Sequence, residues 1–425
     1  MKVSTFKKIG LGLASISALM VLGACSSSGS KTDGSNDANS SSDSKTLTIS
    51  VDKGYTEYMN AIKGQFEKDN DVTIKLVEKD MFEQLEALAL DGPAGKAPDV
   101  MMSAYDRIGS LGAQGHLAEV NVDANASDYD DTDKAQVTVD GKIYGAPAVI
   151  ETLVLYYNKD LVDAAPASFT DLEALAKDSR FDFTSESGKN TGFLAKWTDF
   201  YYSYGLLAGY GGYVFGEDGT DPSDIGLNNS GAVEGITYAA DWFNNVWPQG
   251  MKDVSSAGDF VTQQFIDGTA AAIIDGPWQA ATYKDAGVNY GVASIPTLDN
   301  GKAYQSFGGG KGWVVSNYSK NKELGQKFLD YVTNQENQET FFEMTNEIPA
   351  NQAARETAKG KNDELTTAVI TQYADAQPMP NIQEMAEVWT GAENLMFDAA
   401  SGTKTPQESA DDAVALIKEA IEQKY

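Results

Sequence analysis

The sequence predicts an α/β fold, spread over two domains, in which each sheet is flanked by helices. Strand-like and helix-like apolar patterns alternate from residue 46 onward, as they do where strands are joined by covering helices. About 380 of the 425 residues remain once an N-terminal leader and a polar segment are set aside, which is more than a single hydrophobic core usually holds.

The beginning of the folded part carries the clearest pattern. Apolar and polar residues alternate over 47–51 and again over 72–76, which indicates two strands. Between them, apolar residues recur at helical spacing over 55–66. A second helix is expected around 85–89, and a short strand at 99–102. This order predicts a parallel sheet with helices against its faces.

Later segments carry turn and capping signals. Residues 150–157 form an apolar run rich in strand formers, and the Asp-Gly pair at 140–141 predicts a hairpin. Residues 170–173 and 405–408 have the form of capping boxes, and the second of these opens a C-terminal helix. The glycines at 308–310 predict a tight turn before another strand.

The N-terminus has the features of a secreted lipoprotein. Residues 1–24 combine three lysines with an apolar stretch, as a signal peptide does. Their end resembles the lipobox of bacterial lipoproteins, which implies acylation of the thiol of Cys25, the one cysteine of the chain. Residues 25–45 are small and polar and predict a flexible tether. A plain secretory signal with an incidental cysteine is the alternative.

Charge and rare residues exclude several classes of function. The formal net charge is −30, and it argues against nucleic acid as a partner and against adsorption to an anionic membrane. His116 is the one histidine, so histidine-based catalysis and the commoner transition-metal sites are not expected. No phosphate loop, nucleophile elbow, EF-hand or dinucleotide fingerprint is present. We therefore expect no cofactor, no bound metal and no enzymatic activity.

Aromatic residues cluster in a way that suits sugar rings. Five of them fall within eight residues: Trp197, Phe200, Tyr201, Tyr202 and Tyr204. Trp278 follows a Gly-Pro turn at a predicted strand end, and Trp389 lies between Val388 and Thr390. An aromatic plate can desolvate the C–H face of a pyranose without taking away its hydroxyl hydrogen bonds. Core packing is the commoner fate of any one aromatic residue and remains the alternative.

Charged residues stand at the ends of predicted strands. Asp52 and Lys53 follow the first strand, Asp106 and Arg107 follow the strand near residue 100, and Glu151 lies inside an apolar run. Ligands of open α/β sheets bind outside the carboxyl ends of the strands, where carboxylates can accept and cations donate hydrogen bonds to hydroxyls. Intramolecular salt bridges are the alternative for the same residues.

Several motifs stand in order along the mature chain. They are Asp52-Lys53-Gly54-Tyr55, Ala97-Pro98-Asp99-Val100, Ala104-Tyr105-Asp106-Arg107-Ile108-Gly109, Tyr157-Asn158-Lys159-Asp160-Leu161, Gly211-Gly212-Tyr213-Val214-Phe215, Asp275-Gly276-Pro277-Trp278, Met379-Pro380-Asn381-Ile382 and Ala399-Ala400-Ser401-Gly402. With these motifs, the sequence resembles the maltose/maltodextrin-binding proteins of bacterial ABC importers.

The resemblance implies a fold and a set of ligand contacts. The fold would be that of the periplasmic binding proteins, with two α/β lobes, a hinge and an interlobe cleft. The N-terminal lobe would comprise 46–149 and 308–352, and the C-terminal lobe 154–305 and 356–425. By position, the hydroxyl-binding residues would be Asp52, Lys53, Asp106, Arg107, Glu151 and Asp199, where Asp199 replaces the family's usual glutamate. The aromatic plates would be Tyr201, Trp278 and Trp389.

Three positions depart from the family's pattern. Ser103 stands where the best-known members have a tryptophan, and Thr390 and Glu393 replace a tyrosine and an arginine. Lys311 is a candidate for an additional polar contact. These differences concern the ends of the cleft, and therefore the preferred oligosaccharide length more than the substrate class.

The resemblance also implies a role. A lipid-anchored, extracytoplasmic monomer would capture malto-oligosaccharides by lobe closure and deliver them to membrane permease subunits of an ABC transporter. The alternatives are a binding protein for another oligosaccharide or for a nucleoside-type ligand, a secreted glycoside hydrolase with two flanking carboxyl groups, and an adhesin or scaffold built on the same lobes.

Overall fold

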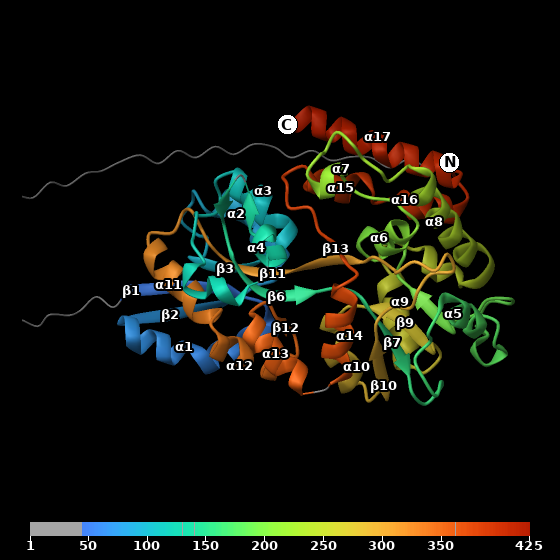
Figure 1. Cartoon of the computed structure of the whole chain (residues 1–425), viewed down its shortest axis with the longest axis horizontal. Coiled ribbons are helices and arrows are strands. Elements are labelled where there is room, and N and C mark those ends of the chain that lie inside the picture. Colours follow the sequence, from blue (N-terminus) through green and yellow to red (C-terminus); the bar gives the residue numbers. More distant parts are fainter. Residues whose placement is uncertain (1–44, 130, 140, 362) are drawn as a thin grey trace, which may run out of the picture. The chain divides into compact units, whose positions relative to one another are not determined.

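A computed structural model describes residues 45–129, 131–139, 141–361 and 363–425 (Figure 1). The described residues all belong to one compact unit, Ser44–Tyr425. The predicted signal peptide, Cys25 and the predicted tether up to residue 44 lie outside the described residues.

The first sheet collects strands from both halves of the chain. Their bounds are β1 (Lys45–Val51), β2 (Val72–Glu78), β3 (Val100–Ala104), β6 (Ala146–Glu151), β11 (Phe307–Val315), β12 (Ile348–Pro349) and β13 (Gln377–Pro378). Within the described residues the order is β12-β6-β11-β3-β1-β2, with β13 paired to β11. The prediction of a parallel sheet is confirmed for β2, β1 and β3. The prediction did not extend to the other strands: β11 pairs antiparallel with β3 and with β6, and β12 pairs antiparallel with β6.

Helices cover both faces of this first sheet. They are α1 (Thr56–Asn70), α2 (Met81–Asp91), α3 (Tyr105–Ala113), α4 (Asp131–Gln136), α11 (Lys322–Val332), α12 (Gln335–Thr345) and α13 (Gln352–Gly360). Figure 1 draws α2, α3 and α4 above the sheet and α1, α12 and α13 below it. The predicted apolar stripe of α1 is confirmed, since Met59, Ile62 and Phe66 are buried against the sheet and α12.

The second sheet is smaller and has its own helices. Its strands are β7 (Val154–Asn158), β8 (Phe193–Ala195), β9 (Ala272–Asp275) and β10 (Tyr290–Ala293), in the order β10-β7-β9-β8 for the part of the chain that is described. The helices are α5 (Phe169–Leu175), α6 (Phe200–Gly209), α7 (Gly216–Gly219), α8 (Ser230–Asp241), α9 (Ala257–Ile266), α10 (Ala280–Asp285), α14 (Glu364–Tyr373), α15 (Met385–Gly391), α16 (Leu395–Ser401) and α17 (Pro406–Lys424).

Short elements complete the described chain. A hairpin joins β4 (Thr138–Val139) to β5 (Lys142–Ile143), as the Asp-Gly pair predicts. Short helical turns are η1 (Lys53–Tyr55), η2 (Asp123–Asp128), η3 (Ser179–Phe181), η5 (Gln249–Lys252) and η6 (Pro277–Gln279), and η4 (Trp242–Val246) is a π-helical turn. None of the helices in the described ranges is both long and apolar enough to cross a membrane.

Two segments link the sheets: the chain passes from β6 to β7 and from β10 to β11. The apolar run at 150–157 is divided between the sheets, because Glu151 ends β6 in the first sheet and Val154 starts β7 in the second. The turn predicted at 308–310 is wrong, because these glycines belong to β11. A Cβ at Gly310 would lie 1.9 Å from the Val149 carbonyl oxygen, so glycine permits the close approach of β11 to β6.

A third link follows α13. This helix packs against α12 and β12, whereas α14 packs against β10 and β7. The predicted lobes, 46–149 with 308–352 and 154–305 with 356–425, remain a proposal, and these contacts favour placing the third crossing after Gly360.

The two predicted capping boxes have different outcomes. The box at 405–408 is confirmed, because the Thr405 hydroxyl accepts from the Glu408 amide and the Glu408 carboxylate accepts from the Thr405 amide. The box at 170–173 is wrong: the N-cap of α5 is Ser168, paired with Asp171. Phe169 and Leu172 are both buried, so the helix starts where Phe169 can enter the core.

Candidate functional site

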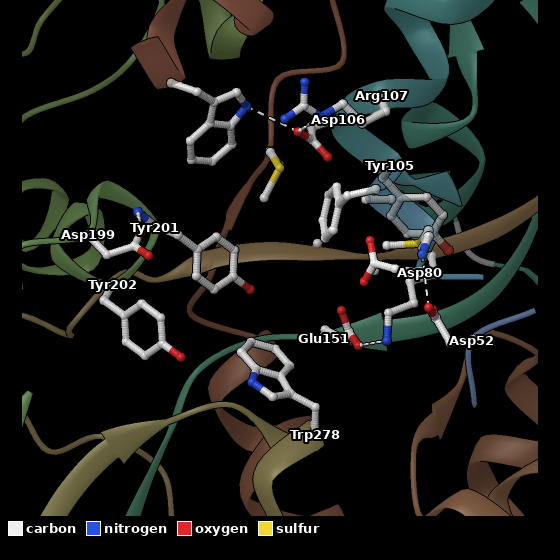
Figure 2. A pocket seen from close by; sticks show the side chains of 18 residues that line it. Asp52, Asp80, Tyr105, Asp106, Arg107, Glu151, Asp199, Tyr201, Tyr202 and Trp278 are labelled. Carbon is white, nitrogen blue, oxygen red and sulfur yellow. Dashed lines mark hydrogen bonds and ion pairs between the residues drawn. The ribbon is translucent and has the colours of Figure 1, made fainter. Parts of the chain in front are cut away.

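The ends of strands from both sheets face a cavity of about 490 Å³ (Figure 2). Eight of the nine residues predicted to bind ligand line it: Asp52, Asp106, Arg107, Glu151, Asp199, Tyr201, Trp278 and Trp389. Lys53 is exposed in η1 and is not among the lining residues, so its role stays a prediction. The cavity volume falls within the range usual for small-molecule sites, about 300–1,000 Å³.

The polar side of the cavity, which we call the charged wall, is formed by Asp52, Asp106, Arg107, Glu151 and Lys311. All five come from the first sheet or from the turns that directly follow its strands. Asp52 follows β1, the Asp106–Arg107 pair follows β3 in the first turn of α3, and Glu151 is the last residue of β6. Strand ends therefore place these charges together, as expected for an open α/β sheet.

Asp106 is held by two neighbours. Its Oδ2 accepts a hydrogen bond of 3.1 Å from the Trp389 indole Nε1 and lies 3.3 Å from Arg107 Nε. Arg107 Nε is buried, and in the described part of the chain it has no hydrogen-bond acceptor despite this ion pair. Burial raises the pKa of Asp106, and the Arg107 charge and the Trp389 bond oppose that rise.

Lys311 stands at the centre of a buried ionic network. Its Nζ donates to Glu151 Oε1 at 2.5 Å, to Glu347 Oε2 at 2.8 Å and to the Tyr55 hydroxyl at 2.9 Å. The Tyr55 hydroxyl in turn donates to Glu347 Oε1 at 2.6 Å. One cation on β11 is thus shared by two carboxylates and a phenol from three other segments of the chain, which satisfies charges that would otherwise be costly to bury.

The network sets the ionisation of its members. Burial alone would lower the pKa of Lys311, but the attraction of Glu151 and Glu347 raises it well above its usual value. Burial raises the pKa of Glu151, and Lys311 opposes the rise. Glu151 thus depends on Lys311 to stay ionised where it faces the cavity.

The opposite side of the cavity, which we call the aromatic wall, is formed by Tyr201, Tyr202, Trp278 and Trp389. The tyrosines lie in the first turn of α6, Trp278 in η6 after β9, and Trp389 in α15. The Tyr201 and Trp278 ring centroids are 6.1 Å apart. In Figure 2, Tyr201 and Trp278 lie around the open space that Glu151 and Asp106 also face. The arrangement offers apolar plates opposite hydrogen-bonding groups.

Buried groups hold this aromatic wall from behind. The Phe307 ring packs against Tyr201 and Trp389, with centroids 6.0 and 5.9 Å away. Asp275, at the end of β9, accepts from the Tyr202 hydroxyl at 2.9 Å and from the Tyr283 hydroxyl at 2.6 Å. The neutral donors keep the buried Asp275 carboxylate satisfied, although burial raises its pKa.

Two local features aim side chains into the cavity. Asp199 is the N-cap of α6, where it accepts from the Tyr201 amide at 2.9 Å and pairs with Lys196 at 3.0 Å. Gly276 lies under the Trp278 indole: a Cβ there would come within 2.2 Å of the ring. The Gly-Pro-Trp sequence therefore lets the indole fold back over its own backbone.

The residues that line the cavity can bind a ligand through hydrogen bonds and apolar contacts. In the described ranges no group of three or more His, Cys, Asp or Glu side chains is suited to hold a metal ion. The cavity instead combines carboxylates, cations and aromatic rings, which together match a neutral polyhydroxylated ligand with apolar ring faces.

Several lining residues were not predicted as ligand contacts. They are Asp80, Met81, Phe82, Ala104, Tyr105, Tyr202, Gly309, Gly310 and Met379. Tyr202 could have been predicted as a ligand contact, because it belongs to the aromatic cluster at 197–204 of the sequence. Glu347 and Tyr55 support Lys311 without a local sequence signal, because each lies far from Lys311 in the chain or in another element.

Comparisons with known proteins agree with this geometry. The bacterial extracellular solute-binding protein family matches residues 61–368. A maltodextrin-binding protein of Bacillus subtilis (strain 168) is 61% identical over 419 residues, which cover 98% of this chain and 99% of that protein. The curated relatives thus match the chain over nearly its whole length.

Solved structures are similar over the same region. A maltose-binding protein of Listeria monocytogenes in complex with maltose is 74% identical, with a TM-score of 0.83, and covers 90% of this chain and 100% of its own. A protein of Streptococcus pneumoniae in complex with maltopentaose is 55% identical, with a TM-score of 0.85, and covers 88% and 100%.

Proposed function

Because the chain belongs to the bacterial extracellular solute-binding protein family, we propose that it binds malto-oligosaccharides in this cavity and delivers them to an ABC importer. The observation that carries the proposal is the meeting of the charged wall and the aromatic wall in one cavity of about 490 Å³. Relatives whose names or structures record maltodextrin, maltose or maltopentaose support this choice of ligand.

Each wall has a distinct task in the proposed binding mode. Tyr201, Trp278 and Trp389 cover the apolar faces of glucosyl rings. The carboxylates of Asp106 and Glu151 accept bonds from sugar hydroxyls, and the buried Arg107 Nε, which has no hydrogen-bond acceptor among the described residues, can donate one. Asp52, Lys53 and Asp199 complete the proposed set of polar contacts.

Capture works by domain closure. The two walls come from different sheets, and the chain crosses between these sheets from β6 to β7 and from β10 to β11. A sugar that touches both walls stabilises the arrangement in which they face each other, because only that arrangement makes both sets of contacts. The closed form then docks on the permease subunits in the membrane.

The experiment is titration calorimetry with maltose, maltotriose, maltotetraose and an unrelated glycan such as cellotetraose. We expect saturable heats for the α-1,4-glucans alone, together with a smaller radius of gyration on binding. Absence of heat with every α-1,4-glucan would exclude the proposed ligand, and heat with another glycan would point to a different oligosaccharide.

Binding without catalysis is part of the proposal. Asp106 and Glu151 are two buried carboxyl groups with raised pKa values in one cavity, and a glycoside hydrolase would need such a pair. Glu151 is engaged by Lys311, however, and both groups have hydrogen-bonding partners that suit holding rather than reacting. Chromatography of maltotetraose after long incubation distinguishes the two roles: unchanged sugar supports binding, and shorter products would establish hydrolysis.

The proposed location is the outer face of the cell membrane. Cys25 would carry the lipid, and the segment from Cys25 to the start of β1 at Lys45 would act as a tether for a monomer. A lipoprotein relative of Streptococcus pneumoniae, 53% identical over 98% of this chain, supports this assignment. Metabolic labelling with a palmitate analogue should mark the wild type and leave Cys25→Ser unlabelled and released into the medium; equal labelling of both would refute the anchor.

A further inference from the structure

Phe82 presents an aromatic ring to the cavity from the side of the charged wall. In the described ranges, six large hydrophobic side chains are well exposed: Phe82, Leu90, Trp278, Met344, Leu416 and Tyr425. Of these, Phe82 and Trp278 line the cavity. A lone exposed hydrophobic residue is ordinary, but two exposed aromatic rings in one cavity, contributed by opposite sheets, point to a shared ligand.

The local fold displays Phe82 rather than burying it. The face of α2 that packs inward carries Met81, Gln84, Leu85 and Leu88, and Phe82 lies off this face with 47% of its surface exposed. Leu90, on the same helix, is 79% exposed but does not line the cavity. The sequence of α2 therefore places one exposed apolar side chain in the cavity and another outside it.

The backbone that carries Phe82 is fixed by two carboxylates. Asp52 Oδ1 accepts from the Met81 amide at 2.9 Å, and Asp80 Oδ1 accepts from the Glu83 amide at 2.9 Å. These bonds hold the first turn of α2 on both sides of Phe82. An aromatic ring on a fixed turn loses little freedom when it contacts a ligand, which favours binding.

The position of this turn defines one end of the cavity. Figure 2 places Asp52 and Asp80 at the opposite end from Asp199 and Tyr202. Phe82 follows Asp80 by two residues in the same lined segment. A ligand that spans from Tyr202 and Trp278 to Phe82 would fill the cavity along its length, with the Asp80 carboxylate beside it to accept hydroxyl bonds.

We propose that Phe82 forms an aromatic subsite for an additional glucosyl unit and sets a preference for malto-oligosaccharides longer than maltose. The inference rests on the proposed function, because it assigns a length preference within that substrate class. The exposed ring covers the apolar face of the sugar unit that extends past the central contacts. A disaccharide held at Trp278 and Tyr201 does not reach this subsite.

The test is calorimetry over a length series from maltose to maltopentaose with wild type, Phe82→Ala and the matched control Leu90→Ala. Phe82→Ala should weaken maltotetraose binding roughly tenfold and leave maltose binding nearly unchanged. Leu90→Ala, an exposed position on the same helix outside the cavity, should match the wild type at every length. Phe82→Tyr should retain the length preference.

Each outcome bears on a separate claim. Equal loss of affinity at all lengths, or no loss at any length, overturns the subsite. Normal sugar binding by Phe82→Ala together with reduced uptake by cells would assign Phe82 to permease docking and also overturns it. A wild-type protein that binds no α-1,4-glucan refutes the proposed function itself. Thermal unfolding of Phe82→Ala and Phe82→Tyr checks that both variants are folded.

Discussion

The charged wall and the aromatic wall face the same cavity but depend on the rest of the molecule in opposite ways. The charged wall depends on the buried Lys311–Glu151 ion pair, whose further partners Glu347 and Tyr55 lie outside the cavity lining. The aromatic wall rests on ordinary packing, and Trp278 remains 37% exposed. Changes to the charged wall should therefore disturb the fold, whereas changes to the aromatic wall should mainly disturb binding.

The largest expected effect is on stability and comes from Lys311. Its replacement by methionine (K311M) leaves Glu151 and Glu347 buried without a cation, which should lower the free energy of unfolding by about 3–5 kcal/mol. Burial raises the pKa of Glu151, and protonation of this carboxylate removes part of the unpaired charge, so the deficit should shrink as the pH falls through that raised value. Urea denaturation at several pH values measures both effects.

The control for this comparison is the exposed pair between Lys159 and Glu364, whose side chains are 36% and 51% exposed. K159M should change stability by about 1 kcal/mol or less, because water already solvates both charges. If K311M proved as stable as K159M, the charged wall would not depend on its buried network.

The second effect falls on affinity. Removing the Trp278 indole (W278A) should weaken maltotetraose binding by about 2–3 kcal/mol while the unfolding free energy stays close to that of the wild type, since the ring is partly exposed and packs on one side. Calorimetry and urea denaturation separate the two quantities. Replacement of the buried Trp197 (W197A) should instead act on stability, and should lower the free energy of unfolding far more than W278A does. An equal loss of stability in W278A and W197A would contradict the assignment of Trp278 to binding and of Trp197 to the fold.

A third prediction concerns the support behind the aromatic wall. The Tyr283 hydroxyl donates to the buried Asp275 carboxylate at 2.6 Å, and Y283F removes this donor with little change in shape. The expected loss of stability is about 1.5 kcal/mol, typical of a hydrogen bond to a charged group. Tyr202 still donates to Asp275, so sugar affinity should change less than stability. A large fall in affinity with unchanged stability would show that Asp275 acts on the ligand directly.

The smallest effect is the dependence of affinity on pH. Burial raises the pKa values of Asp106 and Glu151, so both begin to protonate at a pH above the range of an ordinary carboxyl group. A protonated carboxyl accepts hydroxyl bonds less well, and affinity should fall by less than about tenfold as pH drops through these raised values. The D106N variant should show a weaker dependence of sugar affinity on pH than the wild type. An affinity that rises toward acidic pH would contradict the ionised state of the charged wall.

More of the residues that line the cavity could be predicted from the sequence than of the residues that hold them in place. Asp52 and Asp106 were singled out because each follows an apolar strand pattern, Glu151 because it lies inside an apolar run, and Trp278 because it follows a Gly-Pro turn; the family resemblance then implied their roles. Phe82 was missed, because one phenylalanine on an amphipathic helix is normally part of the core. Only the position of α2 against the cavity distinguishes it.

The boundaries between elements were harder to predict from the sequence than the presence of the elements. The run at 150–157 has a uniform apolar composition, yet β6 and β7, between which it is divided, belong to different sheets. The glycines at 308–310 are compatible with a tight turn, and they are equally compatible with a strand that passes close to β6. In both cases the deciding contact is made by residues that lie elsewhere in the sequence.

The amino-acid sequence by itself determined the alternation of strands and helices, the acidic character of the chain and the residue types of both walls, since these depend on composition and on spacing between near neighbours. Only the tertiary structure decided that Lys311 meets Glu151, Glu347 and Tyr55, that Phe82 shares a cavity with Trp278, and that Trp389 donates to Asp106. These pairs are distant in sequence, and their meeting follows from how two sheets pack and cross, which no local pattern of side chains records.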